Sequence, residues 1–336
     1  MKRVLVFLLG LGLCLGANQV LANDPARDQP VNRDVSFGNW SAVCDGQGGC
    51  STWGLGASWA TPGYIILATG ADGRRTITLG AYDTNDERRW HAPLLFSIEI
   101  IDKLDRVIWS KAFPGRDESR IWLRARITNP TEVDRALQAL AVGKGARLKV
   151  DGRTEPATVV SLNGSAAALL WSRGQDDIDL TRPVIRRAAG VSQGHLPKTR
   201  PPVKYGNYDG GCPADKEMVT AARLAPGRVL WIATCETGYN NDSILRVADE
   251  RGQPLLTPAI EPLSGEEAET NLTYDPATRV LTSTFYGNST WTCGETHQWV
   301  WDGERFRFSS QSRMDDCEGM NRNDWPVLYR ARIVDR

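Results

Sequence analysis

Two short runs of β-type residues, joined by an Asp-Gly turn and bracketed by cysteines, constrain the fold of this chain most. Residues 298–301 and 305–308 are rich in aromatic and β-branched side chains. Gly303 lies between them and forms a strong turn signal, because glycine accepts a positive φ. Cys293 precedes the first run and Cys317 follows the second. A disulfide between them would close the open end of a β-hairpin.

Six cysteines remain once Cys14, which lies in the apolar leader, is set aside. An even number in an exported chain favours disulfides, although six cysteines permit fifteen pairings. Each bridge would contribute roughly 2 to 4 kcal/mol by restricting the unfolded chain. The simplest scheme keeps every bridge inside one domain and pairs sequence neighbours: Cys44 with Cys50, Cys212 with Cys235, and Cys293 with Cys317.

The N-terminus has the three parts of an export signal. A basic pair precedes an apolar run at residues 4–15, which is too short to span a membrane comfortably, and small residues then lead to Ala22. Leu13 stands where a lipoprotein signal has a small residue before its cysteine, so Cys14 is expected to leave with the signal. Since no second apolar run approaches membrane length, the mature chain is expected to be periplasmic or secreted, without a membrane span.

The charge balance excludes two classes of partner. Forty basic residues cancel forty acidic ones, and no basic run is present. Neither nucleic acid nor an anionic membrane surface is therefore a predicted partner. The chain has no C-x-x-C motif and only three histidines, His91, His195 and His297, so no metal and no cofactor is predicted.

The predicted fold class is mainly β, with two antiparallel β domains, each a sandwich or a meander. Alternation of apolar and polar residues is clearest at 75–82 and 122–128, and Asx-Gly turns separate such runs. The length of 336 residues is sufficient for two cores. The predicted divisions are a signal peptide at 1–22, a flexible leader at 23–34, an N-terminal β-rich domain at 35–189, a linker at 190–205, and a C-terminal β domain at 206–336.

Two short helices are predicted in the first domain. After Asn129-Pro130 the apolar period changes, and Thr131 is expected to cap a helix that ends near Gly143. Ser165 is expected to cap a second helix over residues 166–171.

Several spaced motifs occur over nearly the whole mature chain. They are Trp40-x-x-x-Cys44-Asp45 with Cys50, Ser161-Leu162-Asn163-Gly164-Ser165 with the following Ala-Ala-Ala-Leu-Leu, Trp301-Asp302-Gly303-x-x-Phe306, Cys317-Glu318-Gly319 and Trp325-Pro326. Together these motifs resemble the domain of unknown function 1176 family. The resemblance implies an exported proteobacterial protein whose N-terminal half is similar to invasion-associated locus B proteins, which are small periplasmic or surface-associated β-domains linked to host-cell entry. It implies no catalytic residues.

Catalytic motifs are missing from the sequence. It contains no G-x-S-x-G, no S-x-x-K of the β-lactam type and no H-E-x-x-H. His297 lies in a predicted strand beside Trp299, where a structural role is the simpler interpretation. This pattern favours a binding protein over an enzyme.

Candidate binding residues fall into two groups. Asp315 and Asp316 concentrate carboxylates beside Cys317, where they would either bind calcium, serve a glycosidase or decorate a solvated turn. The chain also has twelve tryptophans. Most are expected in the core, but three lie in Gly-rich or loop-like surroundings and are candidates for stacking on a ligand: Trp53, Trp59 and Trp291.

The predicted function is that of an exported periplasmic, non-enzymatic protein that binds an envelope protein or glycan. The alternatives are an inhibitor or chaperone-like module of envelope enzymes, and a cell-wall glycan hydrolase that uses Asp and Glu. Two carboxyls that face each other across a deep cleft would favour the hydrolase, whereas a protruding loop or an aromatic patch would favour binding.

The first prediction concerns export. Cleavage after Ala22 should give a mature protein that begins at Asn23, which intact-mass spectrometry of the exported protein measures. An Ala22→Arg variant should keep its leader, because the enzyme that removes the signal needs a small residue there. An intact Met1 in the exported protein, or a lipid on Cys14, would contradict the prediction.

Overall fold

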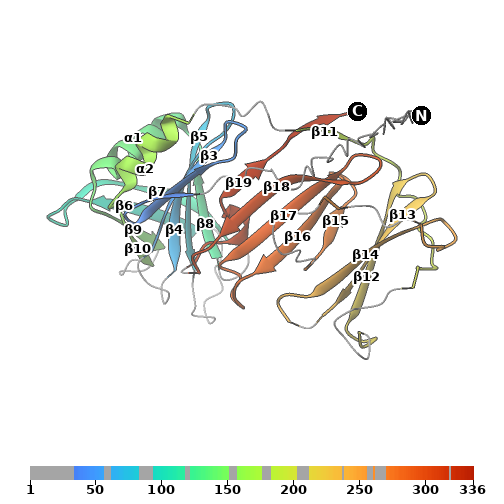
Figure 1. Cartoon of the computed structure of the whole chain (residues 1–336). Helices are drawn as coiled ribbons and strands as arrows, with labels where there is room; N and C mark the ends of the chain where they lie inside the picture. The colour runs from blue at the N-terminus through green and yellow to red at the C-terminus, as the bar shows by residue number, and fades with distance from the viewer. Residues whose placement is uncertain are drawn as a thin grey trace, which may run out of the picture.

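The computed structural model describes residues 34–56, 62–82, 94–117, 122–150, 157–175, 183–202, 212–236, 238–255, 260–261, 270–317 and 319–336. The predicted signal peptide, Trp59 and His91 lie outside these residues. The described chain is mainly β, as the sequence predicts. Figure 1 shows a large sheet with two helices at one end, a five-stranded sheet in the middle and a three-stranded sheet at the other end.

The N-terminal sheet has ten strands, all paired antiparallel, in the order β1-β2-β3-β4-β5-β8-β7-β6-β9-β10. It curls back on itself, because a bridge joins Gly56 to Val160 and Trp40 Nε1 donates a hydrogen bond to Ser161 O at 2.7 Å. The strands are β1 Val35–Phe37, β2 Trp40–Cys44, β3 Cys50–Leu55, β4 Gly63–Thr69, β5 Arg75–Tyr82, β6 Leu94–Ile101, β7 Val107–Asp117, β8 Trp122–Ile127, β9 Gly145–Val150 and β10 Thr158–Ser161.

The two predicted helices are present, but their N-terminal caps differ from the prediction. α1 (Pro130–Val142) is capped by Asn129, whose side chain accepts a hydrogen bond from Glu132 N at 3.2 Å, and not by Thr131. α2 (Ser165–Arg173) follows Gly164, which has a positive φ of 96° and no capping side chain. Ser165 instead donates to Leu140 O at 2.7 Å, so its hydroxyl ties α2 to α1. Both helices pack on the core of the N-terminal sheet.

The C-terminal region contains three smaller sheets. In the five-stranded sheet the order follows the sequence from β15 to β19, and in the three-stranded sheet from β12 to β14. β11 and β20 pair in parallel, so the described chain is not antiparallel throughout. The elements are β11 Val184–Arg187, β12 Glu217–Ala225, β13 Arg228–Cys235, β14 Asp242–Ala248, β15 Thr273–Asp275, β16 Val280–Tyr286, β17 Gly294–Trp301, β18 Phe306–Met314, the 3-10 helix η1 Arg322–Asp324, β19 Val327–Arg330 and β20 Arg332–Asp335.

The predicted hairpin is formed by β17 and β18, which are longer than the aromatic runs suggested. Trp301 pairs with Phe306, and Gly303 in the turn has a φ of 108°. The Asp302 carboxylate accepts hydrogen bonds from Glu304 N and Arg305 N, both at 2.9 Å, which fixes the turn. Trp299 and Trp301 are both buried in the core that the five-stranded sheet shares with β13 and β14.

Three disulfides join the neighbouring pairs that the simplest scheme proposes. They connect Cys44 to Cys50, Cys212 to Cys235 and Cys293 to Cys317. None of the helices in the described residues is long and apolar enough to cross a membrane.

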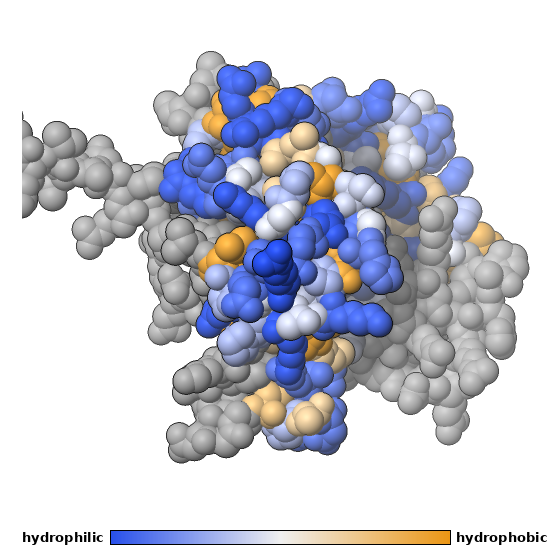
Figure 2. Space-filling view, turned by 90° about the vertical axis from the view of Figure 1, so that its right-hand side faces the viewer, coloured by the Kyte–Doolittle hydropathy of each residue, from blue (hydrophilic) through white to orange (hydrophobic). Residues whose placement is uncertain are grey.

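The segment expected to be a linker lies along the three-stranded sheet. The Gln193 side chain accepts a hydrogen bond from Arg223 N at 2.8 Å and donates one to Arg223 O at 3.1 Å. Leu196 packs on the small apolar cluster around Val229 and Trp231. Gln193 and Leu196 therefore have defined partners, although residues 190–202 form no strand. Figure 2 shows the face at the end of the molecule that carries the three-stranded sheet. This face is mainly hydrophilic, and its hydrophobic residues form small separate patches.

An apolar cluster joins the ten-stranded sheet to the end of the five-stranded sheet. It combines side chains from both ends of the chain and is completely separate from the two main cores. We call it the junction cluster, and its buried members are Val43, Trp53, Tyr64, Ile66, Trp122, Met314, Met320, Trp325 and Leu328.

A buried carboxylate completes the junction cluster. Asp324, whose side chain is only 5% exposed, accepts a hydrogen bond from Tyr64 OH at 2.6 Å and forms an ion pair with Arg124. Burial raises the pKa of Tyr64 well above its usual value, and the negative charge of Asp324 raises it further. The hydroxyl of Tyr64 therefore remains a donor to Asp324 up to strongly alkaline pH.

Substitution of Asp324 should strongly destabilise the protein. Asp324→Ala removes the counter-ion of Arg124 and the acceptor of Tyr64, so we expect a loss of about 3 to 5 kcal/mol in the free energy of unfolding. The matched control is Asp134→Ala, since Asp134 forms a 2.6 Å ion pair with Arg75 whose side chains are 50% and 40% exposed. This control should cost less than about 1 kcal/mol. Denaturant unfolding measures both, and equal losses would contradict the role of the junction.

The hairpin turn gives a second stability prediction. Gly303→Val should lose about 1 to 3 kcal/mol, because a β-branched residue is strained at a positive φ. Gly174→Ala is the control, since Gly174 has a φ of −86° and an added Cβ would come no closer than 3.6 Å to its neighbour. Denaturant unfolding followed by tryptophan fluorescence measures both variants. A Gly303→Val protein as stable as its parent would contradict the turn assignment.

Candidate binding sites

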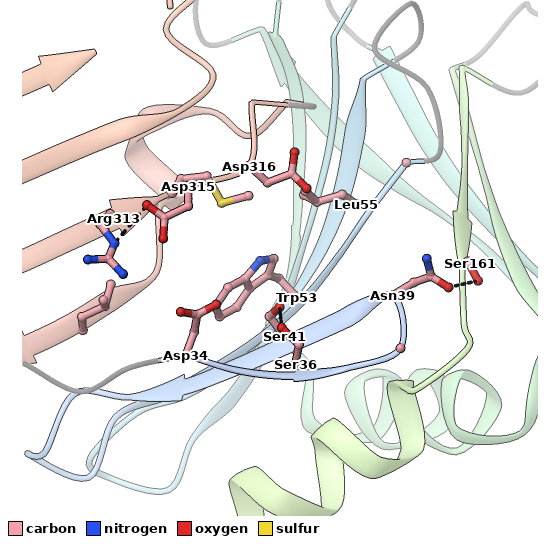
Figure 3. Close-up of a pocket in the computed structure, with 14 residues that line it drawn as sticks. Asp34, Ser36, Asn39, Ser41, Trp53, Leu55, Ser161, Arg313, Asp315 and Asp316 are labelled. Atoms are coloured by element: carbon pink, nitrogen blue, oxygen red, sulfur yellow. Dashed lines mark hydrogen bonds and ion pairs between the residues drawn. The ribbon is translucent and has the colours of Figure 1, made fainter. Parts of the chain in front are cut away.

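The first candidate site is a pocket beside the junction cluster, with a volume of about 370 Å³. We call it the junction pocket. One wall comes from β1, β2 and β3, and the other from the end of β18 and the residues that follow (Figure 3). Among its lining side chains are Asp34, Ser41, Trp53, Arg313, Asp315 and Asp316. The structure thus brings three of the candidate binding residues together from opposite ends of the chain.

Trp53 reaches the pocket from a strand and not from a loop. The Cys44–Cys50 disulfide closes the Gly-rich turn, so the chain returns at once as β3, where Trp53 pairs with Ser41 on β2 and Ile66 on β4. Its side chain is only 6% exposed. The expected surface position of Trp53 is therefore wrong, and only a small part of its ring contributes to the pocket wall.

Asp315 and Asp316 extend from the end of β18 on the opposite wall (Figure 3). Arg313 Nε lies 3.1 Å from Asp315 Oδ1, and the Asp315 side chain is 71% exposed. Together with Asp34, the lining residues contribute three carboxylates against one guanidinium. The junction pocket is therefore negatively charged and carries an aromatic edge.

Calcium binding at this pocket has no structural support in the described residues. Among them, no group of three or more His, Cys, Asp or Glu side chains is arranged to hold a metal ion. Arg313 also forms an ion pair with Asp315, so a calcium ion that bound Asp315 would have to displace the Arg313 guanidinium.

The second candidate site is a groove on the five-stranded sheet, with a volume of about 530 Å³. We call it the sheet groove. Trp291, which is 50% exposed, stands at its edge, as predicted for a tryptophan in a loop. Tyr286 lies next to it with ring centroids 5.9 Å apart, and Arg322 donates a hydrogen bond to the Tyr286 hydroxyl. Trp59, the third candidate tryptophan, lies outside the described residues.

His297 belongs to neither site. It is buried between Trp299 and Phe308, and its Nε2 lies 3.0 Å from Glu295 Oε1. Burial alone would raise the pKa of Glu295, but its hydrogen bonds and the charges of His297 and Arg313 outweigh this, so the pKa is lowered. The ring contact between His297 and Phe308 joins β17 to β18, which fits a structural histidine.

Several lining residues were not among the sequence candidates. Asp34 and Arg313 carry no local signal, because only the folded junction brings them together. A signal did exist for the sheet groove. Thr282 and Thr284 are two positions apart on β16, and so are Thr296 and Gln298 on β17. Side chains two positions apart on a strand lie on the same face of the sheet.

The fold and both sites define a mainly β, disulfide-linked protein with two concave polar surfaces. Residues 181–332 match the model of the family described as protein of unknown function (DUF1176). The predicted resemblance to this family is confirmed for residues 181–332, which contain the motifs from Trp301 to Pro326, and the motifs before residue 181 lie outside the matched part.

Two further proteins are similar to this chain. The uncharacterized protein YpfG of Escherichia coli (strain K12) is 24% identical over 333 residues, which cover 88% of this chain and 92% of that protein. The crystal structure of invasion associated protein b from Bartonella henselae has 17% sequence identity and a TM-score of 0.33, and the match covers 42% of this chain and 96% of that one. Neither similarity assigns a ligand or an activity to this chain.

Proposed function

We propose that this is an exported protein that binds a cationic segment of a cell-envelope protein in the junction pocket, without catalysing a reaction. The observation that carries the proposal is the convergence of Trp53, Asp315 and Asp316 on one negatively charged pocket. Export is supported by the leader and by three disulfides, which persist in oxidising compartments. The proposed location is the periplasm or the exterior of the cell.

The chemistry of the junction pocket suits a lysine or arginine side chain. Asp34 and Asp316 supply exposed carboxylates that form charge-assisted hydrogen bonds with a cation. Arg313 orients Asp315 and partly balances the negative charge of the pocket. The exposed edge of Trp53 adds apolar contact area for the aliphatic stem of such a side chain.

Hydrolysis of a glycan is the second candidate, because carboxylates stand on both walls of the pocket (Figure 3). A glycosidase needs one carboxylic acid that is shielded from water, so that it keeps its proton at neutral pH. Asp34, Asp315 and Asp316 are all exposed. Binding is therefore the better-supported function of these carboxylates.

The test is site-specific photo-crosslinking in living cells. A photoreactive amino acid in place of Ser36, which lines the pocket, should give an adduct with an envelope protein. The double variant Asp315→Asn/Asp316→Asn should abolish most of that adduct, because it removes the carboxylates, while changing the free energy of unfolding by less than about 0.5 kcal/mol. Denaturant unfolding checks the stability of the purified variant.

The matched crosslinking control places the same photoreactive group at Asp72, in the exposed turn between β4 and β5. Equal adducts at both positions, or an adduct that survives the double substitution, would contradict the proposed site. Release of soluble fragments from purified cell wall by the parent protein, lost in the Asp315→Asn/Asp316→Asn variant, would instead support the hydrolase.

A further inference from the structure

The sheet groove is a second, independent site whose chemistry differs from that of the junction pocket. Its floor is formed by side chains from four adjacent strands, β15 to β18. Strands spaced about 4.8 Å apart give a floor about 14 Å wide, which is longer than a single sugar ring. The floor residues are Thr273, Thr282, Thr284, Thr296, Gln298 and Ser312.

The strand register places these hydroxyl and amide groups in two rows. Thr282 pairs with Thr273 on one side and with Gln298 on the other, and Thr296 pairs in turn with Thr284 and Ser312. Hydroxyls and amides both donate and accept hydrogen bonds. The side chains of Thr282, Gln298 and Ser312 form no hydrogen bond with any group in the part of the chain that the structure describes. Two rows of such groups match the hydroxyls of a sugar.

An aromatic wall borders this polar floor. Trp291 is half exposed and has a φ of 59°, a conformation that bulky residues rarely adopt. Tyr286 stands beside it, and Tyr239, which is 44% exposed, lies on another part of the rim. Flat amphipathic rings at the edge of a polar groove can stack on the apolar face of a pyranose.

The loop that carries Trp291 is fixed in place. Asn288 and Thr292 exchange two hydrogen bonds, at 2.7 and 3.1 Å, across the residue. The Thr292 hydroxyl also donates to Cys317 O at 3.0 Å, and the Cys293–Cys317 disulfide follows directly. A strained conformation persists only where its surroundings impose it. The loop therefore holds a pre-positioned indole at the edge of the groove.

Asparagine side chains fix the tyrosines of the groove. The Asn240 side chain donates to Tyr286 O at 2.7 Å and accepts from Tyr286 N at 2.8 Å. The Asn271 side chain donates to Tyr239 O at 3.0 Å and to Thr284 O at 2.9 Å. These bonds attach the loop between β13 and β14 to the end of β16. The groove is thus built from the five-stranded sheet and from a loop of the three-stranded sheet, and it has a defined shape before any ligand arrives.

Charge narrows the class of ligand. Arg322 is the only charged residue among the described residues that line the groove, and it lies over the Tyr286 ring, 5.8 Å from its centroid. A nucleic acid would need several cations, and a typical protein interface would need a more apolar centre. Neutral polar groups beside exposed aromatic rings are suited to an uncharged oligosaccharide.

We propose that the sheet groove binds a neutral oligosaccharide, with Trp291 as the stacking platform and the Thr/Gln rows as hydrogen-bonding partners. The proposal does not rest on the function proposed for the junction pocket, because the two sites share no lining residue.

The experiment is titration calorimetry of the full mature protein with tetra-N-acetylchitotetraose and, separately, with maltotetraose. Binding of at least one of them is expected. Trp291→Ala should weaken that binding about tenfold or more, because it removes an exposed aromatic anchor. Thr282→Val should also weaken it, since the variant keeps the β-branched shape and loses the hydroxyl.

Phe285→Ala is the matched control, because Phe285 is a 45% exposed aromatic residue on β16 that does not line the groove. Its affinity for the oligosaccharide should be unchanged, and so should that of Asp315→Asn/Asp316→Asn. Failure of both oligosaccharides to bind, or an equal loss of affinity in Phe285→Ala and Trp291→Ala, would overturn the proposal. Denaturant unfolding of each variant separates lost binding from lost folding.

Discussion

The buried carboxylate of Asp324 is the interaction on which the arrangement of the two halves depends. A buried charge is tolerated only when hydrogen bonds and an opposite charge compensate it, and here Tyr64 and Arg124 supply both from the ten-stranded sheet. The junction cluster lies beside the Asp324 carboxylate, and the low exposure of this carboxylate strengthens these contacts. Arg330 adds a second link, because its backbone N–H donates to Asp45 O at 3.1 Å and its guanidinium pairs with the Asp45 carboxylate. Apolar packing supplies the contact area between the two halves, and the charged groups fix how the halves are positioned against each other.

Both candidate sites depend on the segment that Asp324 holds. η1 carries Asp324 into the junction, while Arg322 of the same short helix lies in the sheet groove. On the other side of this segment, Asp315 and Asp316 leave β18 for the junction pocket. The geometry of either site therefore relies on the docking of residues 314–317 and 319–325 between the ten-stranded and the five-stranded sheet. In this arrangement a stability contact and two candidate binding surfaces share one stretch of chain.

Sequence patterns among near neighbours predicted the local structure well, but they did not predict contacts between distant segments of the chain. The turn at Gly303 and the disulfide pairs follow from patterns within a few tens of residues. The parallel pairing of β11 with β20 joins segments about 150 residues apart, and no local period can reveal that. The same limit explains Trp53: its Gly-rich neighbourhood suggests a loop, but pairing to β2 and β4 makes it a buried strand residue. The exposure of Trp291 was predictable, because it depends only on the loop in which this residue lies.

The Cys293–Cys317 disulfide connects the two candidate sites as well as the hairpin. Cys293 ends the loop that positions Trp291, and Cys317 directly follows Asp315 and Asp316. A hydrogen bond from the Thr292 hydroxyl to Cys317 O reinforces the same link. Movement of the Asp pair towards a bound cation would therefore be transmitted to the tryptophan loop, unless the hairpin beneath resists it. Since β17 and β18 pair along nearly their whole length, the rigid hairpin resists such movement, which favours two sites that bind their ligands independently.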